Sequence, residues 1–159
     1  PEPPPSVAVP ATIQVEDYIE GGQGVGYNDT TAGNSGGRYR SDDVDIQLCS
    51  DPDWPTGEPC YNVGWTAPGE WLAYAVSVES AGEYRFVARV ATPLRGRAVY
   101  FTVNGVNVTG SLAIPRTGGY QVWTTIRSAP VQLGVGVQEV RLNLEGDGMN
   151  LNWFAIETP

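Results

Sequence analysis

Hydrophobic residues alternate with polar ones along most of the chain, which is typical of strands that bury one face. From Thr12 to Tyr18, for example, Ile13 and Val15 alternate with Gln14 and Glu16. The same period recurs as far as the C-terminus, and no helical period of ten or more residues appears. The pattern predicts strands at residues 12–18, 70–78, 83–92, 98–103, 106–109, 121–127, 129–133, 138–144 and 150–157.

Turn-forming residues separate these segments. Asn104-Gly105 lies between two of them and favours a two-residue hairpin turn. Many short strands joined by such turns predict an all-β fold, namely an antiparallel β-sandwich of the jelly-roll kind. In the last strand, Trp153 shares a face with Leu151 and Ala155, which predicts that its side chain lies in the core.

Two segments lack the strand pattern. Residues 1–11 are rich in proline and read as a linker, so we expect the folded domain to span residues 12–159 as one module of a longer protein. Residues 21–64 are rich in Gly, Asn, Asp, Ser and Thr, and a loop of this length in a small domain is usually functional or disordered. Four aromatic residues within it favour an ordered loop: Tyr27, Tyr39, Trp54 and Tyr61.

The two cysteines lie inside this long loop. Ten residues, many of them turn formers, separate Cys49 from Cys60. A loop of this kind brings its ends together easily, so we predict a disulfide, with two free thiols as the alternative. Because disulfides persist in oxidising compartments, the protein is expected to be secreted.

The charge of the chain disfavours several partners and chemistries. All nine basic residues are Arg, and against 18 acidic residues they give a net charge of −9. This charge repels phosphates and anionic lipids, so neither nucleic acid nor membrane is expected as a partner. The chain has no His, which removes the Ser-His-Asp triad and His-ligated metals. No acidic pair stands out as catalytic, so we expect no enzyme activity, with a glycosidase or lyase as the alternative.

Aromatic and polar residues at loop–strand junctions suggest a sugar-binding surface. Trp65 and Trp123 each lie beside a glycine-containing turn, and Asn150 begins the last strand. A pyranose stacks its apolar face on an exposed aromatic ring, while amides bond its hydroxyl groups. Core packing is the alternative for either Trp.

Oxygen-bearing side chains suggest cation sites. Gln14 and Glu16 lie on the same face of the first strand, and oxygen ligands spaced in this way suit Ca²⁺, with a solvated strand face as the alternative. Asp42, Asp43 and Asp45 are candidates for a second cation, or they solvate the loop.

Several ordered motifs are similar to those of family 6 carbohydrate-binding modules, and the similarity spans residues 12–157. The motifs are QVEDY (14–18), VGYNDTTAGNSGG (25–37), RSDDVDI (40–46), YNVGWTAPGEWLAY (61–74), TGGYQVWTT (117–125) and NLNWF (150–154). This resemblance implies a jelly-roll β-sandwich appended to a secreted polysaccharide-degrading enzyme, usually with a structural calcium ion.

The resemblance also implies roles for particular residues. A sugar ring would lie between Trp65 and Trp123, with Tyr120 as the alternative second aromatic and Asn150 as the hydrogen-bonding amide. On the concave sheet face, Trp71 would be the platform of a further site. The calcium ligands would be Gln14, Glu16, the main-chain carbonyl of Arg38, and Asn152.

The extended loop resembles that of modules attached to agarases and β-1,3-glucanases. It implies binding to the chain end of agar or of a laminarin-type β-1,3-glucan by a monomer tethered to a glycoside hydrolase. The alternatives are a xylan- or cellulose-binding module of the same fold and a calcium-dependent adhesion module.

Overall fold

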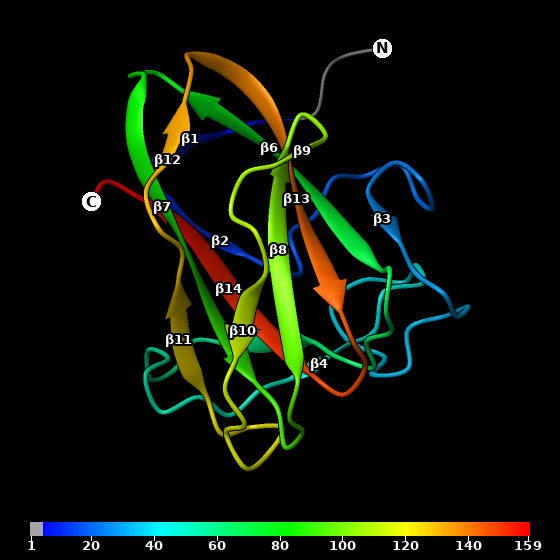
Figure 1. Ribbon diagram of the computed structural model, residues 1–159. Helices are drawn as coiled ribbons and strands as arrows, with labels where there is room; N and C mark the ends of the chain where they lie inside the picture. The colour runs from blue at the N-terminus through cyan, green and yellow to red at the C-terminus, as the bar shows by residue number, and fades with distance from the viewer. Residues whose placement is uncertain (1–4) are drawn as a thin grey trace.

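Two stacked β-sheets make up residues 5–159, the part of the chain that the computed structural model describes (Figure 1). The first sheet has the order β1 (Val7–Val9), β6 (Trp71–Val78), β13 (Gly136–Glu145), β8 (Arg97–Val103) and β10 (Leu112–Ile114), with β3 (Tyr27–Asn28) on β6 and β9 (Val106–Asn107) on β8. The second has the order β11 (Thr124–Arg127), β7 (Gly82–Ala91), β14 (Asn150–Glu157), β5 (Tyr61–Val63) and β4 (Ile46–Leu48), with β12 (Val131–Leu133) on β7 and β2 (Ala11–Gln14) on β14.

Strand pairing within the sheets is antiparallel, apart from the parallel contact of β1 with β6. The predicted antiparallel β-sandwich is therefore confirmed. No helix within residues 5–159 has the length and apolar character needed to cross a membrane.

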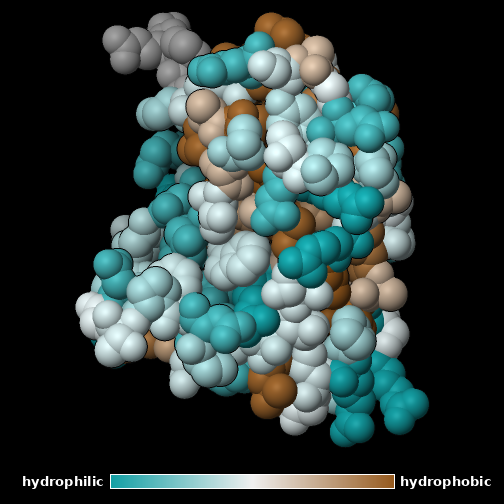
Figure 2. All heavy atoms as spheres, turned by 90° about the vertical axis from the view of Figure 1, so that its left-hand side faces the viewer, coloured by the Kyte–Doolittle hydropathy of each residue, from teal (hydrophilic) through white to brown (hydrophobic). Residues whose placement is uncertain are grey.

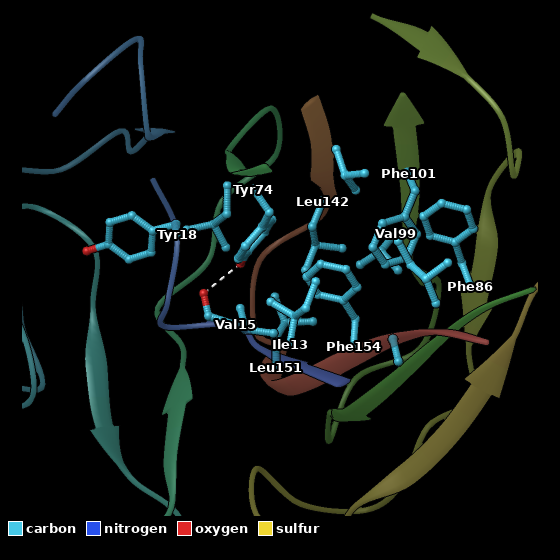
Figure 3. Packing of buried hydrophobic residues seen from close by; sticks show 14 of the residues in the cluster. Ile13, Val15, Tyr18, Tyr74, Phe86, Val99, Phe101, Leu142, Leu151 and Phe154 are labelled. Atoms are coloured by element: carbon cyan, nitrogen blue, oxygen red, sulfur yellow. Dashed lines mark hydrogen bonds between the residues drawn. The ribbon is translucent and has the colours of Figure 1, made fainter. Parts of the chain in front are cut away.

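The core lies between the sheets and is built by the alternating positions (Figure 3). Phe101 from the first sheet packs against Phe86 and Phe154 from the second, with ring centroids 4.9 and 5.2 Å apart. Tyr74 packs edge-on against Phe154 at 4.8 Å. Its buried hydroxyl donates to the Val15 carbonyl at 2.6 Å, so this aromatic ring is buried without losing its hydrogen bond.

Most predicted strands are present, with boundaries shifted by a few residues. The Asn104-Gly105 hairpin is confirmed, and both residues have the positive φ (48° and 81°) that a type I′ turn requires. Short strands within and beyond the long polar loop were not predicted, because two or three residues are too few to show a period: β3, β4, β5 and β10.

The predicted linker boundary is wrong for part of residues 1–11. Val7–Val9 forms β1 beside β6, and the side chain of Val9 is buried. The short Val-Ala-Val alternation is bracketed by prolines, whose number makes the segment look like a linker. Residues 1–4 of the predicted linker lie outside the described residues.

The assignment of Trp153 to the core is also wrong. The pairing of β14 with β7 shifts register between Leu151 and Trp153, and after this bulge Phe154 and Ile156 point into the core. Trp153 is only half-buried and does not belong to the core cluster. A bulge adds one residue to a strand and so inverts the faces that simple alternation assigns.

The side of the molecule at the left of Figure 1, which carries β7, β11 and β12, is mainly hydrophilic (Figure 2). Hydrophobic side chains appear there in narrow patches between polar ones. The loops at the lower end of Figure 1 connect the two sheets and hold most of the residues discussed next.

Candidate functional site

Loops at one end of the sandwich surround a pocket of about 680 Å³. They come from the disulfide loop, the segment after β5, the segment before β11, and the turn between β13 and β14, all at the lower end of Figure 1. The lining residues are Gln47, Leu48, Cys49, Ser50, Trp65, Leu94, Tyr120, Gln121, Asp147, Gly148 and Asn150. A larger hollow of about 1060 Å³ beside β1 and β2 contains none of the residues predicted to contact sugar.

Trp65 projects from the sandwich, with half of its surface exposed (50%). Its φ of 47° is unusual for a bulky residue, and such strain persists only where neighbouring contacts fix the backbone. On one side, the Gly64 N–H donates to the Asp45 carbonyl at 2.9 Å. On the other, the buried Thr66 hydroxyl accepts a hydrogen bond from the Met149 N–H at 3.3 Å. The indole is therefore held outward as a platform.

Asn150 lies at the base of the pocket and is 97% buried (3% exposed). Its Nδ2 donates to the Tyr120 carbonyl at 2.7 Å, which orients the amide and ties it to the Tyr120 loop. Gly64 leaves the space that this amide occupies, because a Cβ there would lie 2.6 Å from Asn150 Oδ1. The Tyr120 ring, 49% exposed, lines the same pocket.

Trp123 is not among the residues that line the pocket. Its Nε1–H instead donates to the Ser50 carbonyl at 3.1 Å. Gln121 bonds the N–H of the same residue, since its Oε1 accepts from the Ser50 N–H at 2.8 Å. Its Nε2 donates to Asn62 at 3.0 Å. Of the two predicted candidates for the second aromatic, the structure thus brings Tyr120, rather than Trp123, together with Trp65.

The predicted disulfide between Cys49 and Cys60 is confirmed, and its loop forms part of the pocket. The start of this loop is anchored by Asp51, whose carboxylate accepts two hydrogen bonds from the Arg89 guanidinium at 2.8 and 2.9 Å. Burial alone raises the pKa of Asp51, but Arg89 and the other hydrogen-bond donors lower it below 3.8. At the loop tip, Trp54 donates to the Glu58 carbonyl at 3.2 Å and braces the loop internally.

Trp71, the predicted concave-face platform, is covered by another side chain. The guanidinium of Arg141 lies 3.7 Å from the centroid of the Trp71 ring, a cation–π contact. Arg141 is held there by Glu139, whose carboxylate accepts from its Nε at 2.7 Å. A sugar can stack on this face of Trp71 only after Arg141 moves.

The predicted calcium ligands share a property that fits a cation. Gln14 Oε1, Glu16 Oε1 and Asn152 Oδ1 are buried oxygens that accept no hydrogen bond. Burial raises the pKa of Glu16 to about 8, so a cation would favour its charged form. The Arg38 carbonyl, by contrast, already accepts hydrogen bonds from Asn34 and Arg40. Within residues 5–159 no three Asp, Glu, Cys or His side chains converge on a metal site, so this one would need amide or main-chain oxygens.

A β-sandwich whose end loops present exposed aromatic rings beside a buried, oriented amide belongs to the class of carbohydrate-binding modules, whose role is binding and not catalysis. The chain belongs to the family described as carbohydrate binding module (family 6), whose model matches residues 38–158.

Solved structures of this family are similar along nearly the whole chain. The C-terminal family 6 module of LamC, a marine laminarinase from Zobellia galactanivorans, is 27% identical, with 93% of this chain and 98% of that chain covered and a TM-score of 0.70. A module of Cellvibrio mixtus lichenase 5A, in complex with cellotriose, is 34% identical, with 95% and 98% covered and a TM-score of 0.66.

A similar curated protein is the clotting factor G alpha subunit of Tachypleus tridentatus, which is 36% identical over 97 residues. That match covers 60% of this chain and only 14% of the relative's length. The chain thus corresponds to one small part of that larger protein.

Proposed function

We propose that the pocket at the loop end binds the terminal sugar of a β-linked glucan or galactan, with laminarin-type β-1,3-glucan and agar as the expected ligands. The observation that carries this proposal is the joint presence in one pocket of two half-exposed aromatic rings, Trp65 and Tyr120, and the buried amide of Asn150.

Each of these groups matches one part of a sugar. The Trp65 indole offers a flat apolar surface to the C–H face of a pyranose, and the Tyr120 ring adds a second such surface. The remaining polar atoms of the Asn150 amide bond to hydroxyl groups, and their direction is fixed before the sugar arrives. Asp147, kept in place by Arg97, adds a carboxylate acceptor at the same pocket.

A pocket lined by several loops suits a chain end. An internal sugar of a polymer needs an exit on both sides, whereas a terminal sugar needs only one. Residues of the disulfide loop and of the Asp147-Gly148 turn line the pocket, and in the proposal a ligand enters between them by its end.

The relatives support a β-linked glucose polymer as ligand. One similar module comes from a laminarinase, and another was solved with cellotriose. Cellulose and xylan remain the second candidate, and the cellotriose complex at 34% identity favours cellulose of the two. Contact with one or two sugar rings gives modest affinity, in the range of about 10⁻⁶ to 10⁻³ M.

The wider setting follows from this ligand. In the proposal, the chain is a monomeric module of a secreted glycoside hydrolase, and it raises the effective concentration of the catalytic domain at the polymer. A calcium ion would be held by Gln14, Glu16 and Asn152, with the Arg38 carbonyl as the further predicted ligand. The ion would have a structural role, because its ligands would link the end of β2 to β14.

Affinity gel electrophoresis tests the ligand and the site together. Wild type, Trp65→Ala and Tyr120→Ala are run through gels that contain laminarin, agarose, xylan or soluble cellulose, with Tyr39→Ala as a control for an exposed aromatic ring outside this pocket. We expect laminarin or agarose to retard wild type and the control, and the two pocket variants to lose retardation. Retardation of all four proteins alike would refute the site, and retardation by xylan or cellulose alone would favour the second candidate.

Two further results would redirect the proposal. Release of reducing sugar from these polymers by the isolated chain would indicate a glycosidase. Calcium-dependent capture of a protein partner, without retardation by any glycan, would indicate an adhesion module.

A further inference from the structure

Three consecutive residues at the start of the disulfide loop are each fixed by groups from elsewhere in the chain: Cys49, Ser50 and Asp51. Cys49 is cross-linked to Cys60, and its N–H also donates to the Cys60 carbonyl at 2.8 Å. Asp51 accepts two hydrogen bonds from the Arg89 guanidinium at 2.8 and 2.9 Å. Surface loops are usually the mobile parts of a protein, so this short segment is anchored far more firmly than its position requires.

The middle residue, Ser50, is held at both polar groups of its main chain. Its N–H donates to Gln121 Oε1 at 2.8 Å, and its carbonyl accepts from the Trp123 Nε1–H at 3.1 Å. The two partners lie 71 and 73 residues away in sequence. Ser50 is nevertheless exposed, so water could satisfy the same groups without the loss of chain entropy that ordering the loop costs. The two bonds therefore fix the position of Ser50 and do not compensate for burial.

The Ser50 side chain is the polar group that this anchoring leaves free. Within the described part of the chain, Ser50 takes part in the two main-chain bonds above and its hydroxyl in none. The residue lines the loop-end pocket together with Cys49 and Gln121. A hydroxyl can both donate and accept a hydrogen bond, which matches the hydroxyl groups of a sugar.

Gln121 lines the same pocket, but both ends of its amide are already bonded to protein. Its Oε1 accepts from the Ser50 N–H, and its Nε2 donates to Asn62 at 3.0 Å. Gln121 thus bridges the disulfide loop to β5 and orients Ser50, whereas the Ser50 hydroxyl remains available to a ligand.

We propose that Ser50 Oγ is a further sugar-binding group of this pocket, and that Gln121 and Trp123 are positioning residues that hold it. The inference rests on the proposed function, to which it adds one wall of the pocket, built by the disulfide loop. Because the main chain of Ser50 is fixed before the sugar arrives, little freedom is lost when its hydroxyl bonds to the ligand.

The alternative is that the anchoring only stabilises the loop and that the Ser50 hydroxyl faces water. Ser50→Ala separates the two, because it removes no hydrogen bond within the protein. In both cases the unfolding temperature should equal that of wild type, and only in the proposal does the affinity for sugar fall.

Calorimetric titration with oligosaccharides of laminarin, agarose and cellulose tests the role of Ser50. The proteins are wild type, Ser50→Ala, Trp123→Phe and the double variant Ser50→Ala/Trp123→Phe. Ser80→Ala is the matched control, because Ser80 is an exposed serine outside this pocket, and Trp65→Ala reports on the site itself.

We expect Ser50→Ala to bind the recognised oligosaccharide roughly 2- to 12-fold more weakly than wild type, as for loss of one neutral hydrogen bond, and Ser80→Ala to bind as wild type does. Trp123→Phe should cost no further affinity in the Ser50→Ala background, because residues that act through one another are not additive. If Trp123→Phe does not fold, Ser50→Ala alone decides.

Wild-type affinity of Ser50→Ala, with a loss in Trp65→Ala, would overturn this inference and leave the proposed function intact. Losses from Ser50→Ala and Trp123→Phe that multiply in the double variant would refute the positioning role of Trp123. Absence of binding by wild type, or wild-type affinity of both Ser50→Ala and Trp65→Ala, would refute the proposed site as well.

Discussion

Gly64→Ala tests how the pocket amide is positioned, because this change adds one methyl group against Asn150. The new Cβ would lie 2.6 Å from Asn150 Oδ1, where ordinary contacts begin at 3.4 Å. The amide is buried and hydrogen-bonded to the Tyr120 carbonyl at 2.7 Å, so it has little room to withdraw. Gly64 has no positive φ, so the effect is steric and not a backbone strain.

The expected losses of stability and affinity follow from the displacement of the Asn150 amide. Overpacking a buried position by one methyl group costs about 1–3 kcal/mol of stability. If the Asn150 amide also loses its bond to Tyr120, the sugar loses a fixed hydrogen bond worth about 1–1.5 kcal/mol, or roughly a tenfold weaker affinity.

The assay combines thermal unfolding with calorimetric titration of a laminarin oligosaccharide. Gly134→Ala is the matched control, because a Cβ there meets no atom within 4 Å and its φ is not positive. We expect Gly64→Ala to lower both stability and affinity and the control to lower neither. A folded Gly64→Ala protein with wild-type affinity would refute the view that Asn150 is positioned by its contacts.

Three further predictions concern the disulfide loop and the calcium ion predicted at Glu16. Trp123→Phe keeps an aromatic ring but removes the indole N–H that donates to the Ser50 carbonyl, so the affinity for sugar measured by titration should weaken only a few-fold. Loss of all sugar binding would instead indicate that the sugar stacks on Trp123. Arg89→Met leaves the Asp51 carboxylate buried without its positive partner, so the free energy of unfolding in urea at pH 7 should fall by about 3–5 kcal/mol. An unfolding midpoint equal to that of wild type would contradict this prediction. Because the pKa of Asp51 is lowered, this contribution is present above about pH 3.9 and lost as the pH falls through the lower, folded-state pKa. Calcium at 100 times its Kd should raise the Tm of EDTA-treated protein by about 5–10 °C, and less in Glu16→Gln; an equal rise in both would contradict the predicted ligand.

The alternation of residues was sufficient to predict the core strands. Tyr74, Phe86, Phe101 and Leu142 all belong to the core and lie in strands that the alternation predicted, because strands between two sheets repeat with a period of two. The same rule failed at Trp153, where a bulge adds one residue and no local signal in the sequence announces it.

Part of the candidate site could be predicted from the sequence, and part depended on packing. Trp65 and Asn150 were identified from their motifs, and both line the pocket. The choice between Tyr120 and Trp123 depended on a turn whose course is set by contacts with Ser50 and Asn62, which are far away in sequence. Long-range contacts of this kind leave no pattern in one sequence.

One other residue of the pocket was missed for a similar reason. In the sequence, Asp147 looks like any acidic residue in a turn. Its place at the pocket depends on a contact with the Arg97 side chain, which comes from another strand.

The central claim is that the Trp65 indole is the surface on which a terminal sugar stacks. The most direct measurement is calorimetric titration of wild type and of Trp65→Ala with a laminarin oligosaccharide, after circular dichroism has shown that both are folded. We predict a loss of roughly 5- to 150-fold in affinity for Trp65→Ala, since stacking on an aromatic ring contributes about 1–3 kcal/mol. Equal affinities in the two folded proteins would contradict the account.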